Sequence, residues 1–147
     1  MGLFDAIGSS ASGMQAERVR MDVVSENLAN AETTKAANGQ PYRRKEVVFQ
    51  EAGDQGTTFA SILAGVSGSA PTHGVKVAGI VEDSSPLKRI YDPGHPDADK
   101  NGYVTMPNVN TVTEMTDLIS SSRSYEANVT AMQTAKTMFT KTLDLLR

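Results

Sequence analysis

The sequence of 147 residues contains no cysteine and no tryptophan, and aromatic residues make up only 5% of it. The absence of cysteine excludes disulfides, thiolate nucleophiles and zinc sites with cysteine ligands. The length is that of one ordinary domain. A content of 39% hydrophobic residues with so few aromatic rings argues against a large globular core. We therefore expect long elements that complete their burial against neighbouring molecules.

The excess of negative over positive charge is small, because 14 Lys and Arg against 17 Asp and Glu give a net charge of −3. Binding to nucleic acid usually needs a basic surface that displaces counterions, so we expect none. No apolar run approaches the roughly 20 residues of a membrane-spanning helix, so we expect that the chain is not an integral membrane protein. Residues 1–5 lack the basic and long apolar regions of a cleavable signal peptide.

Proline and glycine are confined largely to the middle of the chain. All six prolines lie between Pro41 and Pro107, and residues 14–38 and 108–147 contain neither type. Helix interiors exclude proline and disfavour glycine. We therefore predict a mainly α fold, in which residues 1–34 and 108–147 form two long terminal helices paired as a coiled coil. Residues 35–107 should form an extended loop and a small β-rich middle segment.

Both predicted helices carry apolar residues at intervals of seven, the pattern of a helix that lies along another helix. Pro107 with Asn108 or Asn110 marks the start of the second helix, and residues 111–114 fit a capping box closed by Glu114. The first helix begins with the small-residue segment 8–13, which permits close approach of a neighbouring backbone. We call the predicted assembly positions the seam: Ile7, Met14, Met21, Leu28, Met115, Leu118, Tyr125, Val129, Met132, Phe139, Leu143 and Leu146.

The middle segment contains two stretches with strand character, residues 42–50 and 74–82, which could pair as a hairpin. The basic run from Arg43 to Lys45 is interpreted as a solvated strand edge that discourages unwanted pairing. Residues 52–72 between the stretches are rich in Gly, Ser, Thr and Ala. We expect a projecting or partner-covered loop there.

No catalytic, cofactor or metal site is predicted. Residues 97–102 match the first half of a calcium loop, but Asn108 stands where the twelfth position needs a bidentate Glu, so we expect an ordinary turn. The two histidines, His73 and His95, are 22 residues apart and lack the spacing of a metal site. No phosphate-binding glycine loop or nucleophile elbow occurs. We therefore expect no enzyme and no cofactor.

Two stretches resemble the bacterial flagellar axial family, which includes rod, hook and hook-associated proteins. The first is SENLANAETT, residues 25–34, and the second runs from Gly74 to Met138 and is similar to the proximal rod members. Residues 51–73 carry no such resemblance. The family motif falls here on Asn27, Leu28, Ala29, Asn30, Thr33 and Thr34.

The resemblance implies a structural subunit of the flagellar basal-body rod, which self-assembles with other axial proteins into a helical tube that transmits torque and surrounds the export channel. It also implies export by the flagellar type III apparatus without signal cleavage, to a rod that spans the periplasm. The implied partners are other proximal rod subunits, further copies of the chain, the distal rod protein, the rod-base adapter and the inner-membrane ring proteins. The heptads alone would also permit a soluble coiled-coil adaptor.

Overall fold

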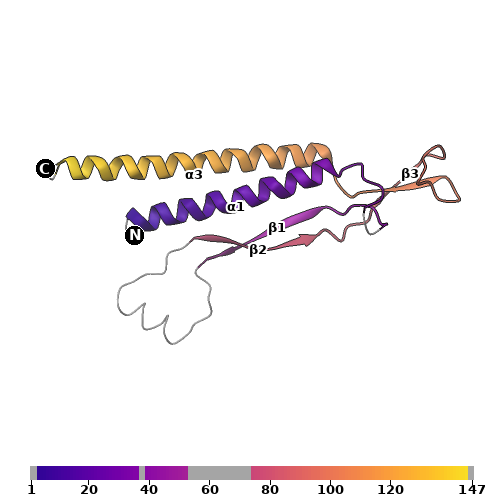
Figure 1. The fold of residues 1–147 in the computed structure, drawn as a ribbon, viewed down its shortest axis with the longest axis horizontal. Coiled ribbons are helices and arrows are strands. Elements are labelled where there is room, and N and C mark those ends of the chain that lie inside the picture. Colours follow the sequence, from indigo (N-terminus) through magenta and orange to yellow (C-terminus); the bar gives the residue numbers. More distant parts are fainter. Residues whose placement is uncertain (1–2, 37–38, 53–73, 146–147) are drawn as a thin grey trace, which may run out of the picture. The chain divides into compact units, whose positions relative to one another are not determined.

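The computed structural model describes residues 3–36, 39–52 and 74–145. Along the chain these form helix α1 (Leu3–Ala29), strands β1 (Lys45–Glu51), β2 (Val75–Glu82), β3 (Lys88–Tyr91) and β4 (Tyr103–Met106), and helix α3 (Thr111–Leu145), as Figure 1 shows. The prediction of a helix at each end with a small antiparallel middle is confirmed. Among the described residues, no helix combines the length and apolarity needed to cross a membrane. The expected loop at 52–72 lies almost wholly outside the described residues.

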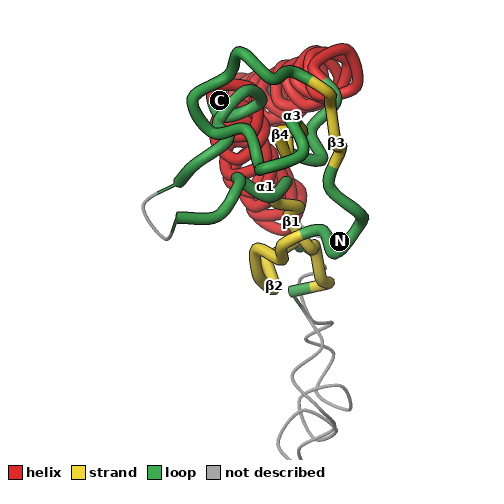
Figure 2. The backbone as a smooth tube through the Cα atoms, turned by 90° about the vertical axis from the view of Figure 1, so that its right-hand side faces the viewer, coloured by secondary structure: helices red, strands yellow, loops and turns green. Residues whose placement is uncertain are grey.

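The chain divides into two compact units. Unit 1 consists of Met1–Val19, Val48–Gly79 and Ser121–Arg147, and unit 2 of Arg20–Val47 and Ile80–Ser120. Each unit therefore contains part of α1, part of α3 and part of the strand segment. Within each unit the α1 and α3 segments lie side by side and run in opposite directions (Figures 1 and 2).

Helix α1 ends at Ala29 because Asn30 closes its last turn. The backbone N–H and the side-chain amide of Asn30 both donate to the carbonyl of Glu26, at 3.1 and 2.9 Å. The Thr33 hydroxyl then donates to the Asn30 side-chain oxygen at 3.2 Å. These contacts satisfy carbonyl and amide groups that a helix end leaves unpaired.

Helix α3 begins after Asn110, whose side-chain oxygen accepts from the backbone N–H groups of Val112 and Thr113 at 3.0 and 3.4 Å. Asn110 is thus the N-cap of α3. It is one of the two asparagines, Asn108 and Asn110, that the sequence offered as the start of this helix. The predicted capping box is wrong. Glu114 turns away from the helix start, because its carboxylate is engaged with side chains of α1 and of the segment before β1.

The strands form two separate two-stranded sheets, β1–β2 and β3–β4. The first corresponds to the predicted hairpin. The second was not predicted, because each strand has only four residues. Its register places Lys88 opposite Met106 and Tyr91 opposite Tyr103. Gly102 turns the connecting loop with a φ of +78°, a conformation that favours glycine.

Few hydrophobic side chains are buried among the described residues, and three of them lie on α1. In unit 1 a Cβ added to Gly13 would lie 2.9 Å from the Asn128 side chain, so the small-residue segment does allow close helix packing. Strand β2 is attached to the same helix, since the Val75 N–H donates to the Ser12 hydroxyl at 3.1 Å. The buried hydrophobic residues are Ala16, Val23, Val24, Tyr42, Val104, Val109 and Ala135.

Candidate functional site

Two of the fully buried side chains of unit 2, Asn27 and Glu114, are polar, and with two neighbours they join three distant segments of the chain. Asn27 comes from α1, Glu114 from the first turns of α3, and Tyr42 and Arg44 from the segment that leads into β1. Asn27 and Glu114 are both 0% exposed. We call these four residues the clasp.

Asn27 uses its full hydrogen-bonding capacity. Its side-chain nitrogen donates to the Lys45 carbonyl at 2.8 Å and to the Glu114 carboxylate at 3.0 Å. Its side-chain oxygen accepts from the Lys45 N–H and from the Tyr42 hydroxyl, both at 2.9 Å. Because an amide offers two donors and two acceptor sites, no polar atom of this buried side chain is left unsatisfied.

The Glu114 carboxylate is neutralised by Arg44. Arg44 Nε donates to Glu114 Oε1 at 2.5 Å, and its other nitrogens reach Glu46 and, at 3.4 Å, Asp117. Burial lowers the pKa of Arg44, but the hydrogen bond to Glu114 and the three neighbouring carboxylates outweigh it, so the net pKa is raised. The guanidinium therefore stays charged and pairs with a carboxylate that has no access to solvent.

The interpretation of the basic run as a solvated strand edge is wrong for Arg44. Besides its ion pairs, the Arg44 N–H donates to the Asn108 side chain at 2.9 Å, and its carbonyl accepts from the Asp83 N–H at 2.8 Å. Lys45 pairs with Glu26 at 2.5 Å on a more exposed surface. A local run of basic residues cannot reveal this difference, because Glu114, the buried acidic partner of Arg44, lies 70 residues away.

Tyr42 closes the clasp beside Asn27. Burial, followed by the negative charges of Glu26, Glu114 and Glu82, raises the pKa of Tyr42 to about 12. The hydroxyl thus stays protonated and donates to Asn27 over the whole physiological range.

The family motif contributes through different contacts. Asn27 belongs to the clasp, and Asn30 and Thr33 form the turn after α1. The Thr34 hydroxyl donates to Asp97 at 2.7 Å. Leu28 is half-buried and Ala29 is exposed. The motif pointed to Asn27, but no signal in the sequence marked Tyr42, Arg44 or Glu114 as the other members of the clasp.

The seam residues that the structure describes are half-buried or exposed in the single chain. The most buried positions of α3 instead are Glu114, Ser121 and Ala135, which repeat at seven and fourteen residues beside the seam. Leu146 lies outside the described residues. The half-buried seam residues are Ile7, Met14, Met21, Leu28, Leu118, Tyr125, Val129 and Met132, and the exposed ones are Met115, Phe139 and Leu143.

The calcium-like segment forms the loop between β3 and β4. The Asp99 carboxylate accepts from the N–H groups of Asn101 and Tyr103 at 2.7 and 3.1 Å, and these bonds lower its pKa. Arg89 donates to the same carboxylate at 2.9 Å. The segment is thus a turn held by side-chain to backbone bonds. In the parts of the chain that the structure describes, no three His, Cys, Asp or Glu residues could hold a metal ion; His73 lies outside these parts.

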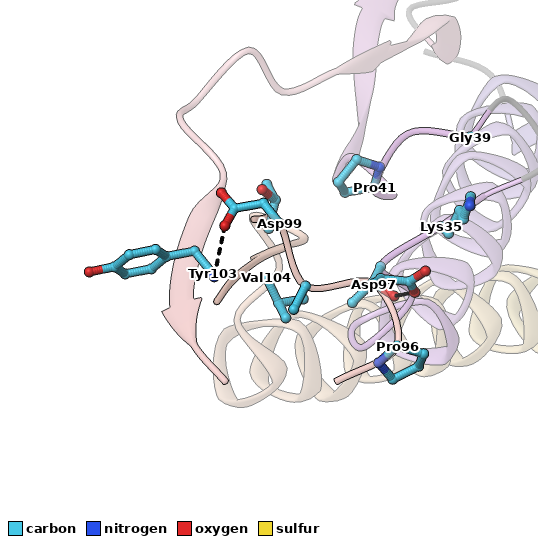
Figure 3. Close-up of a pocket in the computed structure, with 11 residues that line it drawn as sticks. Lys35, Gly39, Pro41, Pro96, Asp97, Asp99, Tyr103 and Val104 are labelled. Carbon is cyan, nitrogen blue, oxygen red and sulfur yellow. Dashed lines mark hydrogen bonds between the residues drawn. The ribbon is translucent and has the colours of Figure 1, made fainter. Parts of the chain in front are cut away.

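A pocket of about 370 Å³ lies between residues 34–41 and 96–105 in unit 2 (Figure 3). Its two carboxylates already have donors, Thr34 for Asp97 and the turn amides for Asp99. Both carboxylates are thus held by neighbouring groups of the same unit, whereas the clasp contains the fully buried polar side chains of this unit.

Comparison with known proteins gives matches at both ends of the chain and along its whole length. The family described as flagella basal body rod protein matches residues 7–36, and the flagellar basal body rod FlgEFG protein C-terminal family matches residues 100–145. The flagellar basal-body rod protein FlgC of Bacillus subtilis is 52% identical over 151 residues, covering 99% of each chain. The FlgC proteins of Borreliella burgdorferi and Salmonella typhimurium are 43% and 44% identical, covering 100% and 99% of this chain and 99% and 96% of their own.

These matches place the chain among the rod proteins of the flagellar basal body, a class of structural subunits rather than soluble adaptors. Within that class it belongs to the FlgC family, and its function is that of a structural subunit of the proximal rod.

Proposed function

We propose that α1 and α3 pair as a coiled coil and pack against the helices of neighbouring subunits, forming a helical tube that transmits torque and surrounds the export channel. The neighbours are further copies of this chain, other proximal rod subunits, the distal rod protein, the rod-base adapter and the inner-membrane ring proteins. The chain reaches the periplasm-spanning rod by export without a cleaved signal. It has no enzymatic role.

The observation that carries this proposal is the apolar surface of α3. Six of its large hydrophobic side chains are 42–71% exposed in the single chain. Large apolar side chains that are exposed in groups mark interaction sites, and here they form two groups. The six are Val112, Met115 and Ile119 in unit 2 and Met138, Phe139 and Leu143 in unit 1.

The first turns of α3 have two distinct faces. Val112, Met115 and Ile119 follow one another at intervals of three and four residues, which places them on one side of the helix. Glu114 and Ser121, both 0% exposed, lie on a different side. One side thus serves the subunit's own clasp, and the other is available to a neighbouring subunit.

Two contacts support the coiled-coil pairing. Asn27 contacts Glu114 in unit 2, and Gly13 lies against Asn128 in unit 1. The two positions on each helix are 14 residues apart, which is two heptads.

The length of α3 suits a stiff structural element. Its 35 residues extend over about 52 Å, far more than a small compact core requires. Subunits that meet through unlike surfaces build open helical assemblies when the rotation between them does not close. Long paired helices in such an assembly provide the rigidity that torque transmission needs.

Replacing Phe139 by aspartate tests the proposal. If a neighbour covers this side chain, the change buries a carboxylate without a partner, which costs several kcal/mol. A null strain complemented with Phe139→Asp should fail to swim while still secreting the variant. Lys141→Asp, at an exposed position two residues away, is the control and should swim normally. Normal swimming of Phe139→Asp would show that this part of the seam is not an assembly surface.

A further inference from the structure

We propose that the clasp fixes the axial register of α1 against α3, a choice that the seven-residue repeats of apolar residues leave open. The inference concerns the fold of each subunit, and it does not depend on how subunits meet.

The apolar positions repeat with a period that permits slippage. On α1, Met21 and Leu28 are seven residues apart, and on α3 Leu118, Tyr125 and Met132 follow the same interval. All five are half-buried. A movement of one helix by seven residues therefore replaces each member of the repeat by the next member of the same repeat. Because hydrophobic burial has no direction, it distinguishes such registers poorly.

The clasp does not tolerate the same movement. A shift of seven residues in one direction brings Ser121 to the position of Glu114, and in the other direction it brings Pro107, which precedes α3. Either shift separates Glu114 from both Asn27 and Arg44. The buried Glu114 carboxylate would then lose its cation and its amide donor, and Arg44 would keep only its more exposed neighbour Glu46. Leaving a buried carboxylate without a partner is strongly unfavourable.

The clasp also sets the position of the segment leading into β1. The Asn27 side-chain amide donates to the C=O of Lys45 and accepts from its N–H, as the backbone of a neighbouring strand would. The preceding residue, Arg44, supplies the guanidinium for Glu114. A shift of this segment by one residue would break both sets of contacts, so three segments are aligned by one group of side chains.

A register role agrees with the general energetics of buried ion pairs. Replacing both partners by apolar residues often leaves stability unchanged or raises it, whereas a buried polar group can select one helix register among several. We therefore expect that removing both charged partners reduces the preference for a single helix register more than it reduces the helix content.

The natural absence of cysteine allows register to be measured directly by cross-linking. A Cβ at position 13 lies 3.2 Å from Asn128 Cγ, which suits a disulfide between Gly13→Cys and Asn128→Cys. Gly13→Cys with Ser121→Cys, and Gly13→Cys with Ala135→Cys, report a shift of one heptad in either direction. Free thiols are counted after mild oxidation of dilute full-length protein, which favours intramolecular bonds.

With the native clasp, only the 13–128 pair should oxidise efficiently. The double substitution Arg44→Met with Glu114→Leu should keep the helical circular dichroism signal. If three registers then have similar free energies, the yield of the 13–128 disulfide should fall to about one third, and both shifted pairs should form. As a control, Arg89→Met with Asp99→Asn removes an exposed ion pair of the β3–β4 hairpin, keeps a side-chain oxygen for the turn amides, and should leave all three yields unchanged.

Two results would overturn the proposal. An unchanged yield of the 13–128 disulfide in the double variant, with no shifted disulfides, would mean that packing alone sets the register. Loss of the helical signal would assign the ion pair to stability rather than to register.

Discussion

Asn27 and Glu114 are 87 residues apart in the sequence, yet they share a hydrogen bond of 3.0 Å and neither residue is exposed to solvent. The bond joins the helix near one end of the chain to the helix near the other. Because Asn27 also holds the Lys45 backbone, one amide side chain links both helices and the strand segment of unit 2. The subunit's architecture therefore depends on a few polar contacts in addition to its small apolar core.

Replacing Asn27 by alanine should lower the free energy of unfolding by about 3 kcal/mol, because it leaves several buried donors and acceptors without partners. Urea unfolding followed by circular dichroism measures the change. Asn101→Ala, which removes an exposed amide, is the matched control and should change stability by less than about 0.5 kcal/mol. Equal effects of the two substitutions would contradict the assignment of Asn27 to a buried network.

Replacing Arg44 alone by methionine should be more harmful than replacing its neighbour Lys45. The first change leaves the Glu114 carboxylate buried without its cation, at a cost of about 3–5 kcal/mol. Lys45→Met removes a partly exposed pair with Glu26 and should cost at most about 1 kcal/mol. Thermal unfolding of both variants provides the comparison, and a Lys45 effect as large as that of Arg44 would argue against a buried ion pair.

Tyr42 should destabilise the fold at high pH through its own ionisation. The folded protein keeps this hydroxyl protonated up to about pH 12, whereas the ordinary pKa of the side chain is 10.0. The raised pKa thus contributes stability that is fully present below pH 10 and is lost as the pH rises towards 12.

The free energy of unfolding of the native protein should consequently fall more steeply than that of Tyr42→Phe between pH 10 and 12. Tyrosinate absorbance identifies the step, because Tyr42→Phe should lack the ionisation near pH 12. A Tyr42 ionisation close to pH 10 would disprove burial of the hydroxyl.

Substituting Gly102 by alanine should weaken the β3–β4 hairpin. The φ of +78° costs about 1–2 kcal/mol for a residue with a side chain, and the new Cβ would lie 2.9 Å from the Tyr91 ring. Faster hydrogen exchange at the hairpin amides would report the effect. Gly94→Ala, in the same loop, meets no atom closer than 3.5 Å and should leave exchange unchanged.

The sequence alone was sufficient for the helices at both ends, the first hairpin and the family. These features depend on local information: the confinement of proline, the heptad spacing and a contiguous motif. Asn110 was identifiable as a cap for the same reason, since its contacts lie within three residues.

Tertiary structure decided the features that involve distant partners. Glu114 has the spacing of a capping-box residue, and Arg44 lies in a basic run, so local reasoning assigned Glu114 to the helix cap and Arg44 to a solvated strand edge. Their actual role follows from their contact with each other, and from that of Glu114 with Asn27, in a site where an unpaired buried charge is too costly to persist. The order of residues fixes which charges exist, but only the fold determines which of them are removed from water together.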